Sequence, residues 1–396
     1  MATTRLPRWP TPTITSSSSS QTSLISSTIP STATSSSNAT VVLSWAARID
    51  KRLAFHLGMP VELLIGADTR ADLISPVGLY HTEFGQIRSV IRKDRVNEES
   101  VGAFAEATFH PLSTVRLILG LRGDAYAFDV RSNIAANSGH STAGIVSPKA
   151  AVAWTPIKAL EIYANYGEGF HSNDGRGTAL TVSPTDGTPR EPVTPLVKAR
   201  GYELGARARP IRGLTLTATY WWLNLKSELQ FQGDAGETAP VGPSKRRGYE
   251  LSAFYKPADW LTIDGQISRS FARETDLPSG ADHIPNALER VLSAGAVVKH
   301  GGASLGARIR HFGAYPIIED NSVRAAPLTV VNARLGYDFG RFQIAADLLN
   351  AFNAKDNEIE YYYTSRLPGE PLEGVDDRHV KPIEPRQLRI SATAHF

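Results

Sequence analysis

Apolar and polar residues alternate one by one along the last seventy residues of the chain. Every second residue is apolar from Val331 to Tyr337, and the pattern returns from Phe342 to Leu348. It is most regular from Leu388 to the terminal Phe396, where polar residues fill the positions between. Because successive side chains of a β-strand point to opposite faces, this alternation predicts three strands, each with one apolar and one polar face.

The same signal begins at residue 41 and continues along the chain. It predicts an all-β protein of about fifteen antiparallel strands, bounded by turn residues. The predicted strands are residues 41–55, 61–74, 97–109, 114–130, 145–155, 159–168, 199–209, 213–231, 245–256, 260–273, 289–300, 302–314, 327–338, 341–352 and 386–396.

Short and long links alternate between these strands. The short links are residues 110–113, 156–158, 210–212, 257–259, 301 and 340. The long links lie near residues 75–96, 131–144, 169–198, 232–244, 274–288, 315–326 and 353–385. Outer-membrane barrels have short periplasmic turns and long extracellular loops, and their strands need roughly 9 to 11 residues to cross the bilayer. The pattern therefore predicts an antiparallel transmembrane β-barrel.

The amino-acid composition argues against several classes of function and structure. The chain has 42 basic and 39 acidic residues, which gives no electrostatic argument for nucleic-acid binding. Cysteine is absent, so disulfides, thiol catalysis and cysteine metal sites are excluded. No window approaches eighteen consecutive apolar residues, which excludes a helical membrane span.

Residues 1–40 differ from the rest of the chain. Serine and threonine dominate them, including a run from Ser16 to Ser20, and such a segment buries too little apolar surface to fold. We expect it to be disordered, and residues 41–396 to form the barrel domain. Serine and threonine also stand where a signal peptide needs an apolar region, so no export signal is visible.

Several stretches resemble TonB-dependent outer-membrane receptors. The closing stretch GVDDRHVKPIEPRQLRISATAHF is similar to the last strands of these receptors, which end in phenylalanine. Two segments that begin with Gly-Tyr-Glu-Leu, at Gly201 and Gly248, resemble the hairpin that recurs in their barrels. The resemblance implies a bacterial outer-membrane protein that contacts lipid. It also implies that the barrel-assembly machinery recognises Phe396.

The resemblance is to the C-terminal part of such a barrel. Receptor barrels of this kind have about 22 strands, so 14 to 15 strands are a partial barrel. No counterpart of the plug domain or of the TonB-binding segment is recognised. We therefore expect a truncated fragment, for which TonB is a partner only if the missing N-terminal region is present, and which cannot perform energised uptake alone.

Two groups of residues are candidate ligand contacts on extracellular loops. They are His171, Ser172, Asn173, Asp174 and Arg176 in the first group, and Asp376, Asp377 and His379 in the second. The first group contains Ser and His, but neighbours in a flexible loop rarely adopt the fixed geometry of a nucleophile and its base. The second contains carboxylates and an imidazole, a pattern more typical of solvated loop charges than of a metal site. We expect no enzymatic activity, no cofactor and no bound metal.

The function implied by the resemblance is ligand-gated, TonB-dependent transport of a ferric siderophore, cobalamin or a similar scarce nutrient. The partner would then be a small molecule or a metal chelate. Two alternatives remain open on the residues alone: a passive barrel pore, and a soluble or surface-exposed all-β binding protein.

Overall fold

A computed structural model describes residues 23–27, 40–84, 86–232 and 237–395. Within these ranges the chain has two short helices, η1 (Ala135–Asn137) and α1 (Gly175–Thr178). No helix within the described ranges is long and apolar enough to cross a membrane.

Nearly all of the regular structure is β-strand. The first strands are β1 (Ser23–Ser27), β2 (Val41–His56), β3 (Pro60–Glu83), β4 (Gln86–Leu112), β5 (Val115–Ser132), β6 (Gly139–Ile157), β7 (Leu160–Ser172) and β8 (Leu196–Ala208). They are followed by β9 (Leu214–Leu225), β10 (Glu228–Gln232), β11 (Glu237–Val241), β12 (Ser244–Ala258), β13 (Leu261–Glu274), β14 (Arg290–His300) and β15 (Ala303–Phe312). The last are β16 (Tyr315–Pro316), β17 (Arg324–Ala325), β18 (Leu328–Asp338), β19 (Phe342–Leu349), β20 (Asn357–Ser365), β21 (Val375–Pro382) and β22 (Gln387–Ala394).

Sixteen strands form one antiparallel sheet in the order β1-β2-β3-β4-β5-β6-β7-β8-β9-β12-β13-β14-β15-β18-β19-β22. Each of the fifteen predicted strands coincides over most of its length with a strand of this sheet, in the predicted order. The single sheet confirms the all-β, barrel-type prediction and differs from the two stacked layers of a sandwich.

The predicted long link at residues 75–96 is wrong. β3 and β4 run through this region and meet at a tight turn next to Phe84, which has a φ of 51°. Pro76 interrupts the pairing without ending the strand, because the register shifts between Ile74 and Val77 and then resumes. A proline at a bulge removes one ladder donor and leaves the flanking pairs intact.

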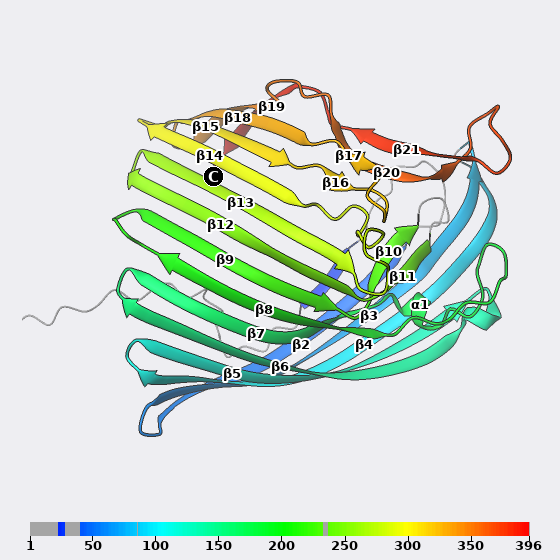
Figure 1. The fold of residues 1–396 in the computed structure, drawn as a ribbon, viewed down its shortest axis with the longest axis horizontal. Helices are drawn as coiled ribbons and strands as arrows, with labels where there is room; N and C mark the ends of the chain where they lie inside the picture. Colours follow the sequence, from blue (N-terminus) through cyan, green and yellow to red (C-terminus); the bar gives the residue numbers. More distant parts are fainter. Residues whose placement is uncertain (1–22, 28–39, 85, 233–236, 396) are drawn as a thin grey trace, which may run out of the picture. The chain divides into compact units, whose positions relative to one another are not determined.

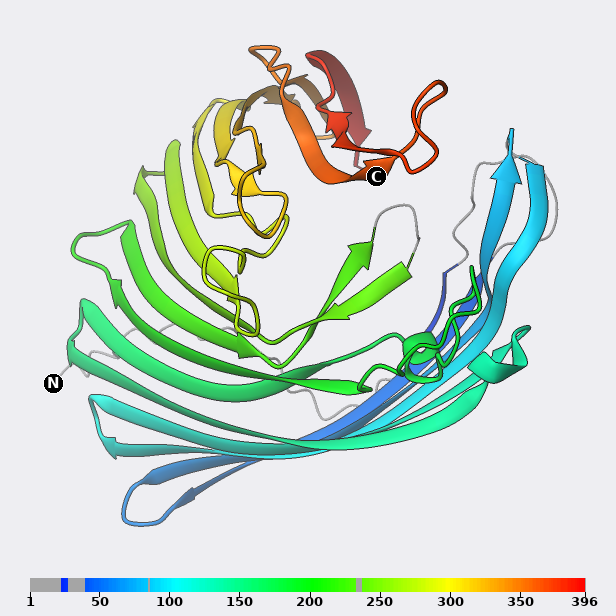
Figure 2. The same ribbon diagram turned by 45° about the vertical axis from the view of Figure 1, so that its right-hand side comes forward.

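Three of the other long links, near residues 232–244, 315–326 and 353–385, hold small hairpins of their own. β10 pairs with β11, β16 with β17 and β20 with β21, each outside the large sheet. The predicted strand 213–231 accordingly divides into β9 and β10. Figure 2 shows the β10–β11 hairpin standing off the ends of β9 and β12.

Part of the predicted disordered segment is described. β1 pairs with β2, with Leu24 opposite Trp45. The rest of residues 1–39 lies outside the described residues, so its predicted disorder stays a prediction.

The chain forms two compact units. The first comprises Met1–Phe109, Leu119–Val146 and Gly175–Pro192. The second comprises His110–Ile118, Ser147–Asp174 and Val193–Phe396. Within the second unit, the short turns that follow β8, β12 and β14 lie at the left ends of the strands in Figure 1, and the long connections lie at the right.

The short turns depend on glycine at two points. Gly213, between β8 and β9, has a φ of 80°, and any side chain there would overlap the Lys256 carbonyl. The turn between β14 and β15 consists of Gly301 and Gly302, both at positive φ. Glycine adopts this left-handed backbone without steric cost.

Apolar side chains gather on one face of the sheet and remain exposed. Leu305 of β15 pairs with Leu335 of β18, and these two side chains are 55% and 59% exposed. Directly opposed residues of an antiparallel pair point to the same face. Because exposed apolar side chains cover a continuous face, this sheet has the surface expected of a wall in contact with lipid.

Candidate ligand-binding site

The other face of the sheet carries paired charges. In the second unit, Arg308 of β15 donates to Asp264 of β13 at 2.7 Å and to the Ser293 hydroxyl of β14 at 2.9 Å. Nearby along the sheet, Arg334 of β18 donates to Asp347 of β19 at 2.9 Å. The Arg334–Asp347 pair joins neighbouring strands, and the Arg308–Asp264 pair reaches across β14, so both pairs connect strands on the charged face of the sheet.

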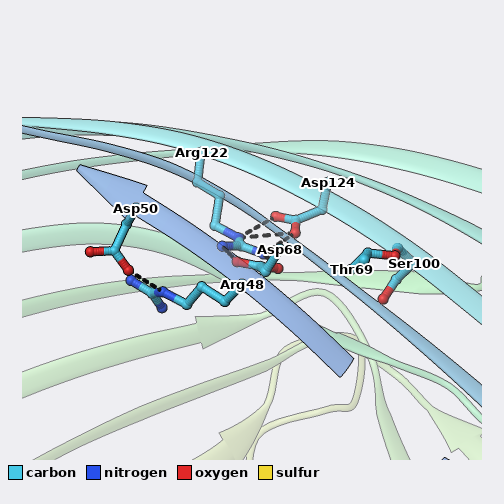
Figure 3. Close-up of polar contacts among 7 residues, drawn as sticks. All are labelled: Arg48, Asp50, Asp68, Thr69, Ser100, Arg122 and Asp124. Atoms are coloured by element: carbon cyan, nitrogen blue, oxygen red, sulfur yellow. Dashed lines mark hydrogen bonds and ion pairs between the residues drawn. The ribbon is translucent and has the colours of Figure 1, made fainter. Parts of the chain in front are cut away.

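The first unit has a denser cluster on its charged face. Arg122 of β5 donates to both oxygens of Asp68 on β3, at 2.7 and 2.8 Å, and to Asp124 at 2.6 Å. Figure 3 shows the Arg122 guanidinium between these carboxylates, with Arg48 next to Asp50. The Arg48 guanidinium also lies 4.8 Å from the centre of the Phe104 ring.

This cluster is a structural brace. The Asp124 side chain is 2% exposed and that of Asp68 is 29% exposed, so Arg122 is the group that compensates their charge. A planar guanidinium suits this position because it binds two carboxylates in fixed geometry. The cluster links β3 to β5 and leaves polar side chains on this face of the sheet.

A cavity of about 520 Å³ opens in the second unit, at the end with the long connections. Arg310 and Phe312 of β15 line it from the charged face, since they alternate with Ile309 and His311. Its other lining residues are Asn286, Leu288, Tyr315, Ala326, Leu328, Val330, Asn357, Glu358, Ile359, Tyr361 and Ile383. Apolar and aromatic walls with a few polar groups are typical of small-molecule sites.

Two polar groups of this cavity, Tyr315 and Glu358, have interactions that affect protonation. Burial raises the pKa of the Tyr315 phenol, so this hydroxyl remains protonated at neutral pH. Glu358 accepts a hydrogen bond from Lys381 at 2.6 Å, and this bond raises the pKa of the lysine. The cavity therefore combines a phenol donor, the Arg310 cation and a carboxylate paired to lysine.

The hairpin β20–β21 forms one wall of the cavity. Glu360 anchors this hairpin and is only 2% exposed. Its carboxylate accepts hydrogen bonds from the Arg378 guanidinium at 2.7 Å and from the Ala326 amide at 3.2 Å. Arg378 also donates to the carbonyl of Arg324 in β17 at 2.9 Å. These bonds fix the hairpin to the preceding connection, and Figure 1 shows β17 and β20 as neighbours.

The second predicted group lies on this hairpin, in a strand instead of an open loop. Asp376 contacts Thr364, and Asp377 accepts the backbone amide of Arg378 at 2.6 Å. The His379 ring stacks on Tyr363 at 3.8 Å between centroids. None of these three predicted residues lines the cavity, whereas Tyr361, the cross-strand partner of His379, does.

The first predicted group is divided by the fold. His171 and Ser172 end β7, in register with Val197 and Leu196 of β8. Asn173 is 3% exposed, and its side-chain amide donates to the Thr194 carbonyl at 2.6 Å. Asn173 therefore closes the base of the β7–β8 connection.

Asp174 and Arg176 complete that group. Asp174 ends a segment of the second unit, whereas Arg176 lies in α1 of the first. The Arg176 carbonyl accepts a hydrogen bond from Arg92 at 3.3 Å. The assignment of these residues to ligand binding stays a prediction.

Residues missed by sequence reasoning organise the same connection within the first unit. Asn137 is fully buried, and its side-chain oxygen accepts the amides of Thr181 and Val182 at 2.9 and 3.0 Å. Farther along, hydrogen bonds from Thr188 hold the pKa of Asp186 at about 2. A turn-forming asparagine gives no signal of its distant partners, because these lie more than forty residues away.

Two further predictions concern metal and the chain end. The described part of the chain holds no group of three His, Cys, Asp or Glu side chains placed to bind a metal ion. Phe396, the predicted assembly signal, lies outside the described residues.

Comparison with known proteins identifies the family. The sequence model for "TonB dependent receptor-like, beta-barrel" matches residues 5–353. No curated protein matches the chain. Solved structures of similar fold include the ferric-catecholate import receptor Fiu from Escherichia coli K12, with a TM-score of 0.70, 16% identity, and coverage of 90% of this chain and 55% of that one.

Two other receptors share the fold. The ferric yersiniabactin uptake receptor FyuA from Yersinia pestis has a TM-score of 0.66 and 14% identity, over 93% of this chain and 56% of its own. The ferripyoverdine receptor of Pseudomonas aeruginosa has a TM-score of 0.67 and 15% identity, over 89% and 48%. This chain thus spans about half the length of the solved receptors. The family match, the single sheet and its two contrasting faces together show that the chain belongs to the TonB-dependent receptor β-barrel family, whose members are transport receptors of the outer membrane.

Proposed function

We propose that this chain provides the wall and long connections of a receptor that takes up a small metal chelate, such as a ferric siderophore or cobalamin, with energy from TonB. The charged face would border the hydrated lumen, and the apolar face would meet lipid. The whole receptor's activity, its ligand and its TonB contact belong to this proposal.

The cavity bounded by β15 and β20 supports the proposal most directly. It lies on the charged face at the end of the long connections, where an external ligand would arrive. Its volume of about 520 Å³ falls within the range of roughly 300 to 1,000 Å³ that holds small ligands. Arg310 would attract an anionic chelate, and the Tyr315 and Tyr361 rings offer flat apolar contact with hydroxyl groups at their edges.

Binding of ferric chelates to the refolded chain in detergent tests this assignment. A panel of catecholate, hydroxamate and carboxylate chelates is titrated while tryptophan fluorescence is recorded. Arg310→Gln removes the cation and is expected to weaken binding of an anionic chelate about tenfold, which corresponds to about 1.4 kcal/mol. His311→Gln is the matched control, since the neighbouring side chain points to the other face.

Equal affinity of the parent and Arg310→Gln proteins for every anionic chelate would remove the cavity from the proposed site. If His311→Gln weakened saturable binding and Arg310→Gln did not, the ligand would bind on the apolar face, which would contradict the proposal. Circular dichroism of each variant shows whether the strand content is retained.

A further inference from the structure

Two long connections of the second unit are hydrogen-bonded to each other beside the chelate cavity. They are residues 275–289, between β13 and β14, and residues 313–327, between β15 and β18. The backbone amide of His283 donates to the Glu319 carbonyl at 3.1 Å, and that of Asn286 donates to the Pro316 carbonyl at 2.8 Å. We call the contact made by these four residues the junction.

The junction lies in the wall of the cavity. Asn286 and Leu288 of the first connection line the cavity, and so does Tyr315 of the second. Ile284 and Ile317, each next to a residue of the junction, are 7% and 3% exposed. Because the two connections share these buried positions and bonds, loosening the junction would displace residues that line the cavity.

A histidine side chain is enclosed at the junction. The His283 side chain is 13% exposed, and its Nδ1 is buried without a hydrogen-bond partner among the described residues. The Asp282 Oδ1 atom lies 3.8 Å from this nitrogen, which is too long for a hydrogen bond but close enough for a strong interaction between opposite charges. A neutral imidazole therefore leaves a buried polar atom unsatisfied at this point.

The segments in contact with His283 carry more acidic than basic groups. They are Arg273 and Glu274 of β13, Asp282 of the first connection, and Glu319 and Asp320 of the second. The Arg273 Nε atom lies 3.6 Å from the Asp282 carboxylate, so this cation is itself partly compensated. Hydrogen bonds from Ser322 lower the pKa of the Asp320 carboxyl, and the charge of the nearby His283 lowers it further. Both Asp282 and Asp320 therefore favour a proton on the histidine.

We propose that protonation of His283 tightens the junction and thereby regulates ligand binding in the chelate cavity. The imidazolium donates from Nδ1 to Asp282 and is held between the Asp282 and Asp320 carboxylates. Histidine changes its charge between about pH 5 and 8. The junction is therefore tight at the acidic end of this range and loosens as the pH rises. The effect on the ligand rests on the proposed function, whereas the proton dependence of the junction does not.

Hydrogen exchange of the full chain in detergent, without ligand, tests the junction itself. The amides of residues 283 and 286 report on it, since both donate across it. After correction for intrinsic exchange rates, we expect them to exchange about threefold more slowly at pH 6 than at pH 8, because the docked state binds the proton more tightly. His283→Gln is expected to abolish this difference. His300→Gln removes an exposed histidine at the β14–β15 turn and should keep the ratio of the parent.

Asp282→Asn is a second variant, which keeps the shape of the side chain and removes its charge. We expect it to reduce the difference between pH 6 and pH 8 while His283 is still present. An equal ratio in the parent and in His283→Gln would overturn the proposal, as would faster exchange of the parent at pH 6 than at pH 8. Circular dichroism shows whether each variant retains its strand content.

The ligand arm measures binding of ferric catecholate, hydroxamate and carboxylate chelates at pH 6 and pH 8. Since a chelate also changes its own charge with pH, the parent is compared with His283→Gln for the same chelate. We expect the parent to gain about threefold more affinity at pH 6 than the variant does, because the junction and the ligand are linked. Chelate binding with equal pH ratios in both proteins would overturn the regulation. Proton-dependent exchange with no chelate binding would support the junction and contradict the proposed function.

Discussion

At the scale of a residue, Arg122 shows how one side chain joins two strands, β5 and β3. Its guanidinium binds Asp68 of β3 and Asp124 of β5, and the Asp124 side chain is 2% exposed. Arg122→Met leaves these carboxylates without their partner. We expect it to lower the free energy of unfolding by roughly 1 to 3 kcal/mol, because an unpaired polar group keeps its desolvation cost. Urea unfolding in detergent, followed by circular dichroism, measures the change.

Two matched variants define this effect. Arg122→Lys keeps the charge but loses the bidentate geometry. We therefore expect it to lower the free energy of unfolding by less than the Met variant does. Arg131→Gln removes a 72% exposed guanidinium at the end of the same strand and should change stability by no more than about 0.5 kcal/mol. A Met variant as stable as the parent would contradict the bracing role of Arg122.

The β20–β21 hairpin depends on a buried acid at the scale of an element. Glu360 accepts hydrogen bonds from Arg378 across the hairpin and from the Ala326 amide outside it. Glu360→Gln keeps the shape and removes the charge that Arg378 needs. We expect the hairpin to be destabilised locally by about 1.5 to 3 kcal/mol, the usual contribution of hydrogen bonds to charged groups. Hydrogen exchange of residues 357–382 measures this opening.

Glu358→Gln is the control within the same strand. Glu358 is 48% exposed and pairs with Lys381, whose side chain is 62% exposed. Exposed pairs of this kind contribute about 0 to 1 kcal/mol. Similar exchange rates in the two variants would show that Glu360 does not anchor the hairpin.

At the scale of the whole molecule, the contrast between the apolar and the charged face decides which face contacts lipid. Leu251 points to the apolar face and its neighbour Ser252 to the charged face, halfway along β12. Leu251→Arg should destabilise the protein in lipid vesicles by roughly 2 to 4 kcal/mol, whereas Ser252→Arg should have little effect. Urea titration in vesicles and the shift of gel mobility on heating measure both.

Two other outcomes of the Leu251→Arg and Ser252→Arg comparison would contradict this assignment of the faces. If Ser252→Arg were the more damaging change, the charged face would be the one in contact with lipid. Equal and small effects of both changes would indicate a protein that does not insert into a bilayer.

Much of the fold was predictable because strand formation and facing are local. The alternation from Val331 to Tyr337 required only the period of two residues, and β18 follows it. The link at residues 75–96 was mispredicted because Pro76 resembles a strand end, although the pairing resumes after it. The adjacent tryptophans near the end of β9 also divide between faces, since Trp222 pairs with Tyr202 on the apolar face while Trp221 pairs with Glu203 on the charged face.

The candidate site was much less predictable. Sequence reasoning favoured Asp376, Asp377 and His379 because charged loop residues are common ligand contacts. The structure instead lines the cavity with Arg310, Tyr315 and Tyr361, from three segments of the chain. Each of these residues looks ordinary in its own strand or connection, so no local pattern distinguishes it.

The sequence by itself determined that the chain forms strands, which face of each strand is apolar, and the family to which the chain belongs. These properties depend on neighbouring residues and on the period of the backbone. Only the tertiary structure decided which distant side chains share a cavity or pair across the sheet. Their proximity depends on the register of strands and on the path of the long connections, because hydrogen bonds between strands fix positions that no single segment encodes.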